Sequence, residues 1–68
     1  MNEEVFNLGV RQFLKKFGIT AQREIERAVE AAIKSGALKG NETIQARAAL
    51  KLEGLPGEVV VEGDIPLS

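Results

Sequence analysis

Residues 5–33, VFNLGVRQFLKKFGITAQREIERAVEAAI, decide the fold of this 68-residue chain. Apolar side chains recur there at spacings of three and four residues, which is the pattern of an amphipathic helix and not of a strand. The tripeptide Gly18-Ile19-Thr20 interrupts the pattern near its middle. The stretch therefore predicts two helices joined by a short hinge.

The first helix is predicted over about residues 3–17. Asn2 is a good N-cap, and the two glutamates that follow it meet the positive end of the helix dipole. Gly18 can adopt the left-handed conformation that closes a helix. The stripe expected to face the core contains every aromatic residue of the chain: Phe6, Val10, Phe13, Leu14 and Phe17.

The second helix is predicted over about residues 21–35, with Thr20 as its N-cap and Gly36 as its left-handed C-cap. Its core stripe is Ile25, Ala28, Val29, Ala32 and Ile33. Its outward face alternates in charge along Gln22, Arg23, Glu26, Arg27 and Glu30, as a solvated face does. Because only a three-residue turn separates the two helices, we expect them to pack as an antiparallel two-helix hairpin.

Two strands are predicted after the helices. Residues 43–52 alternate apolar and polar, yet they are also rich in helix formers, and Asn41 could cap a third helix. The β-branched run Val59-Val60-Val61 needs a strand to pair with, which favours the strand interpretation. Gly54-Leu55-Pro56-Gly57 has the composition of a turn. The sequence thus predicts a β-hairpin with strands over about residues 43–52 and 58–65.

The predicted fold class is α+β, in the order ααββ, as a single domain over residues 1–68. A chain of this length removes only about 60 % of its unfolded surface from water. It contains no cysteine and no histidine, so neither a disulfide nor a Cys/His zinc site supplements the core. Stability is expected to come from the core itself or from a partner subunit.

Charge argues against an unspecific nucleic-acid binder, because the net charge is −1. The opening has no basic start followed by an apolar run, and no stretch reaches the roughly 18 apolar residues of a membrane span. We therefore expect a cytoplasmic location and no membrane contact.

The chain has few side chains suited to catalysis, because it lacks His, Cys and Tyr. The carboxylates Glu58, Glu62 and Asp64 could hold a weak Mg²⁺ or Ca²⁺, but acidic residues at the end of an exposed strand more often prevent edge pairing. The run Gly36 to Asn41 suggests a phosphate cradle, but a helix cap followed by a turn explains it without a ligand. No enzyme, metal site or cofactor is predicted.

The alternative interpretation is a nucleic-acid-binding regulator. Two helices, a turn and a two-stranded ribbon resemble a winged helix-turn-helix domain in shape, with Arg23 and Arg27 as the contacts. Glu26 and Glu30 share the reading face with them and repel phosphate, and the expected wing carries no basic residue. Nucleic acid is therefore the less favoured partner.

Three blocks of sequence are similar to a family of short, uncharacterised bacterial proteins. They are Met1-Asn2-Glu3-Glu4-Val5-Phe6, the block from Phe13 to Thr20 with Gln22 to Glu26, and Glu62-Gly63-Asp64-Ile65. The resemblance covers essentially the full length and implies a stand-alone bacterial protein. The family carries no established activity, ligand or catalytic residue, so it implies none here.

The leading hypothesis is a non-enzymatic protein-interaction or assembly module. A two-stranded hairpin has two free edges and invites pairing with a partner strand or with a second copy, as a homodimer. The expected interaction surface consists of the exposed apolar residues Leu55 and Val60 together with Glu62.

Overall fold

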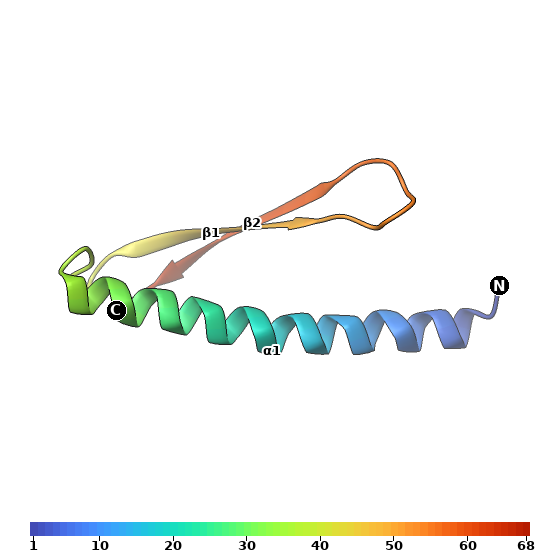
Figure 1. The fold of residues 1–68 in the computed structure, drawn as a ribbon, viewed down its shortest axis with the longest axis horizontal. Helices are drawn as coiled ribbons and strands as arrows, with labels where there is room; N and C mark the ends of the chain where they lie inside the picture. The colour runs from blue at the N-terminus through green and yellow to red at the C-terminus, as the bar shows by residue number, and fades with distance from the viewer. The chain divides into compact units, whose positions relative to one another are not determined.

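The computed structural model describes residues 1–68, and it contains one helix and one β-hairpin (Figure 1). The helix α1 spans Glu3–Ser35, and the strands are β1 (Thr43–Leu50) and β2 (Val59–Pro66). The chain divides into two compact units, Met1–Ala37 and Leu38–Ser68. The α+β class is confirmed, but the order ααββ is wrong, because a single helix takes the place of the two-helix hairpin.

The expected break at Gly18-Ile19-Thr20 does not occur, and α1 continues through it for 33 residues, or about 50 Å. Gly18 is not among the glycines with positive φ, so it does not act as a cap. A break would leave backbone N–H and C=O groups at two new helix ends without helical partners. Keeping those hydrogen bonds, each worth about 0.5–1.5 kcal/mol, outweighs the about 1 kcal/mol that an interior glycine costs.

Both outer ends of the helix agree with the sequence. The Asn2 side chain accepts a hydrogen bond from the backbone N–H of Val5 at 3.1 Å. At the other end Gly36 adopts a left-handed conformation, φ 84°, and its N–H donates to the carbonyl of Ile33 at 3.1 Å. Glutamates occupy the first turn and Lys34 the last, which suits the helix dipole.

On one continuous helix the two predicted stripes join. Eight apolar residues follow one another at spacings of four, four and three residues: Phe6, Val10, Leu14, Phe17, Ala21, Ile25, Ala28 and Ala32. This repeat corresponds to about 3.67 residues per turn, close to the 3.6 of an α-helix, so the stripe runs almost parallel to the helix axis. We call these eight residues the α1 stripe.

The hairpin pairs β1 with β2 antiparallel, from Thr43 opposite Pro66 to Leu50 opposite Val59. The register places Val59, Val61 and Ile65 opposite Leu50, Ala48 and Ile44, so these apolar residues share one face of the hairpin. The strand interpretation of residues 43–52 is therefore correct, although β1 ends at Leu50. Gly54 and Gly57 in the connection have φ of 82° and 93°, which only glycine adopts readily.

Neither unit contains a hydrophobic core. No side chain of the chain is buried, and the three phenylalanines of α1 remain 47–53 % exposed. On the hairpin, Val59 and Val61 are 58 % and 62 % exposed. Within each unit, the residues expected to form a core are present at the expected spacing but remain exposed.

Candidate interaction surfaces

The predicted interaction residues of the hairpin lie in two places. Val60 and Glu62 share one face of β2, since they are two residues apart on the same strand. Leu55 lies in the connection between the strands, where its backbone N–H donates to the carbonyl of Leu52 at 3.2 Å. Val60 is 41 % exposed and Leu55 is 59 % exposed, so both are accessible to a partner.

Two side chains of the neighbouring strand β1 contact the Glu62 carboxylate. Arg47 lies directly opposite it, with its Nε atom 3.7 Å from Oε1 of Glu62. The Gln45 side chain donates from Nε2 to Oε2 of Glu62 at 3.1 Å. The Arg47 and Glu62 side chains are 70 % and 48 % exposed. The three side chains form a short polar ladder beside Val60.

The acidic residues Glu58, Glu62 and Asp64 do not assemble into a ligand set. No group of three or more His, Cys, Asp or Glu side chains in the chain is placed to hold a metal ion. Glu62 faces Arg47, and Asp64 is paired with Gln45 across the ladder.

The loop between α1 and β1 does form an anion cradle, and Glu42 fills it. Its carboxylate accepts the backbone N–H groups of Lys39 at 2.9 Å, Gly40 at 2.9 Å and Asn41 at 3.2 Å. The hydrogen bonds from Lys39 and Gly40 are the main reason that the pKa of Glu42 lies below its ordinary value. Gly40 takes φ 103°, which turns the amides toward one point. The cradle suspected over residues 36–41 is thus a structural turn closed by the chain's own carboxylate.

Sequence reasoning did not identify Glu42. The signal was a carboxylate directly after a Gly-Asn pair, where successive backbone amides in a turn can converge on an anion.

The proposed nucleic-acid contacts Arg23 and Arg27 lie on the side of α1 away from the α1 stripe. Arg27 donates from its guanidinium to Oε1 of Glu24 at 3.3 Å, and their side chains are 74 % and 67 % exposed. The turn that a helix-turn-helix motif requires between two helices is itself helical, over residues 18–20. The resemblance in shape to a winged helix-turn-helix domain, on which the role of Arg23 and Arg27 rested, is therefore lost.

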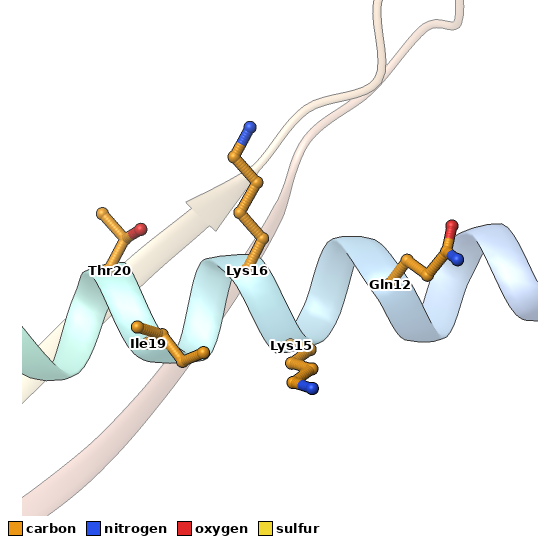
Figure 2. Close-up of a pocket in the computed structure, with 5 residues that line it drawn as sticks. All are labelled: Gln12, Lys15, Lys16, Ile19 and Thr20. Atoms are coloured by element: carbon orange, nitrogen blue, oxygen red, sulfur yellow. The ribbon is translucent and has the colours of Figure 1, made fainter.

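A shallow open depression lies along one side of α1 (Figure 2). Its lining comes from successive turns of the same helix: Gln12, Lys15, Lys16, Ile19 and Thr20. At 100° per residue these positions lie opposite the α1 stripe. Two lysines with one isoleucine offer no enclosed volume and no converging polar groups, so we assign no ligand to it.

The α1 stripe is an exposed apolar feature carried by a single element. Phe17 is 47 % exposed, and its ring stacks on that of Phe13 with centroids 6.3 Å apart. Leu14 is 54 % exposed and Ile25 39 %. Sequence reasoning assigned these residues to an internal core, whereas no second helix exists within the unit Met1–Ala37 to pack on them. The eleven-residue spacing that crosses Gly18 was the signal for one helix.

No helix of the chain is long and apolar enough to cross a membrane. No curated protein and no solved structure matches the sequence. Residues 1–68 match the Family of unknown function (DUF6494). The match spans every element described above, and the chain therefore belongs to this family of unknown function.

Proposed function

We propose that the chain is a non-enzymatic assembly module of the bacterial cytoplasm, which acts by binding a second copy of itself. The observation that carries this proposal is the absence of any buried side chain within either unit, although all three phenylalanines lie on one helix, seven and four residues apart. A regular apolar stripe stabilises a protein only when another surface removes it from water.

The energetics of the separate elements support association. A two-stranded hairpin is marginally stable by itself, and an isolated helix gains little without tertiary packing of its apolar face. Gly9 and Gly18 lower the intrinsic stability of α1 further, by about 1 kcal/mol each. Packing against a partner supplies the burial that each unit lacks.

The hairpin offers a second surface for assembly. Its sheet has only two strands, so β1 and β2 each have one edge with unpaired backbone groups. Val60, Glu62 and the turn residue Leu55 lie on or beside this ribbon, as the interaction surface predicted from the sequence. A strand of a second copy that paired with either edge would extend the sheet.

Light scattering at several concentrations, combined with amide exchange, tests the proposal. We expect a mass above that of the 7.4 kDa monomer, with protection from exchange in α1 and along at least one hairpin edge. A monomeric mass at every concentration, together with unprotected amides along α1 and at both hairpin edges, would refute it.

A further inference from the structure

We infer that two copies of the chain pair through α1 in antiparallel orientation, with the bulky half of one α1 stripe against the alanine-rich half of the other. This inference rests on the proposed function and specifies its interface. The midpoint of α1 (Glu3–Ser35) is Ile19, which is also midway between the first and last residues of the stripe, Phe6 and Ala32. A twofold axis at that level brings positions equally distant from Ile19 face to face.

Side-chain size favours this orientation. All three phenylalanines lie before Ile19, and the three alanines of the stripe lie after it. Antiparallel pairing sets a larger residue of the stripe against an alanine at three levels: Phe6 with Ala32, Val10 with Ala28, and Phe17 with Ala21. Ile25 falls level with Phe13, which borders the stripe, and Leu14 falls level with Glu24. A parallel pair would set phenylalanine against phenylalanine and alanine against alanine, which alternates crowding with gaps.

Charge near the middle of α1 does not decide the orientation. Arg11, Lys15 and Lys16 would meet their own copies in a parallel pair, and in the antiparallel pair they share levels with Arg27, Arg23 and Gln22, beside Glu24 and Glu26.

The helix ends are also complementary. Glu4 in the first turn and Lys34 in the last turn are equally distant from Ile19, so antiparallel pairing brings them to the same level. The two helix dipoles then oppose each other.

The area available is consistent with a stable pair. Phenylalanine buries about 150–250 Å² when fully enclosed, and these rings are half exposed. Six rings therefore contribute roughly 500 Å². The aliphatic members of two stripes add to this and bring the total toward the roughly 1,200 Å² of a small specific interface.

Cysteine pairing tests the orientation, and the chain has no cysteine of its own to interfere. Val10→Cys and Ala28→Cys are mild changes at facing levels of the stripe. In a glutathione redox buffer we expect the mixed pair to form a disulfide and each variant alone to remain reduced. Identical positions would lie about 27 Å apart along the axis, far beyond the reach of a disulfide.

The matched control uses Gln12→Cys and Glu26→Cys. These positions are also equally distant from Ile19, but they lie on the side of α1 away from the stripe, so we expect no disulfide between them. Faster disulfide formation by Val10→Cys with itself than with Ala28→Cys would overturn the antiparallel pair, and so would equal pairing in the control.

A size swap provides the second test. Phe17→Ala leaves a gap beside Ala21 of the other copy, whereas Ala21→Phe places two phenylalanines at one level. We expect each single change to weaken association at least about tenfold, and the double change to return it to within about threefold of the original. Helicity by circular dichroism checks that all three variants keep α1. A double variant that associates no better than the weaker single variant would overturn the pairing.

The outcomes separate the two proposals. If the chain is a dimer by light scattering but the Val10→Cys variant forms a disulfide with itself, the antiparallel interface is wrong and the assembly function stands. If the chain is monomeric, both proposals fail.

Discussion

Substitution of Gly18 by alanine distinguishes one continuous helix from two helices with a hinge. In the structure Gly18 has no left-handed φ, and a Cβ built on it meets no atom within 4 Å. Alanine therefore gains the full difference in helix propensity, about 1 kcal/mol, at no steric cost. If Gly18 instead capped a first helix in the left-handed region, the same change would cost about 1–2 kcal/mol.

The continuous helix and the two-helix arrangement therefore predict changes in the free energy of unfolding of opposite sign, which differ by about 2–3 kcal/mol. Denaturation followed by far-ultraviolet circular dichroism at fixed chain concentration measures the free energy of unfolding. The matched control is Gly36→Ala, because Gly36 has φ 84° at the C-cap of the same helix and should lose about 1 kcal/mol. A loss of stability in Gly18→Ala that equals the loss in Gly36→Ala would contradict the continuous helix.

Three further changes test local features. Asn2→Ala removes the N-cap that accepts the Val5 N–H and should cost about 1 kcal/mol, seen as faster amide exchange in the first turn of α1. The lowered pKa of Glu42 means that its contribution to loop stability is complete above the ordinary value of 4.5 and disappears as the pH falls through the lower folded-state pKa. Glu42→Gln should abolish this pH dependence, which nuclear magnetic resonance can follow at the amide of Gly40. Arg47→Ala breaks only an exposed ion pair with Glu62, so the free energy of unfolding should change by less than about 0.5 kcal/mol, and less still at high salt.

The outer ends of α1 could be predicted because each carries a residue with one strong structural preference. Asn2 caps through its side chain, and Gly36 takes a backbone conformation that other residues avoid. Gly18 can also adopt the left-handed conformation, but in α1 it does not. No proline follows it, and the apolar spacing continues across it from Phe17 to Ala21. Local preference thus suggested a break that continuous backbone hydrogen bonding overrides.

The hairpin was predictable for a different reason. Apolar and polar residues alternate along residues 43–50, and residues 59–61 are β-branched, and both patterns are typical of strands. The two segments pair with each other as antiparallel strands. The lack of a core was not predictable, because the sequence pattern of a buried stripe is the same whether the covering surface belongs to the same chain or to another. Because of that ambiguity, the sequence alone predicts an internal core for the phenylalanines.

The dependence of thermal unfolding on chain concentration tests the central claim most directly, namely that this fold is completed by a second copy. If association buries the α1 stripe, the midpoint of helix loss should rise steadily as the concentration increases from about 5 to about 500 μM. A midpoint that is the same at every concentration, with a cooperative transition, would show that the chain is stable without a partner and would contradict the account.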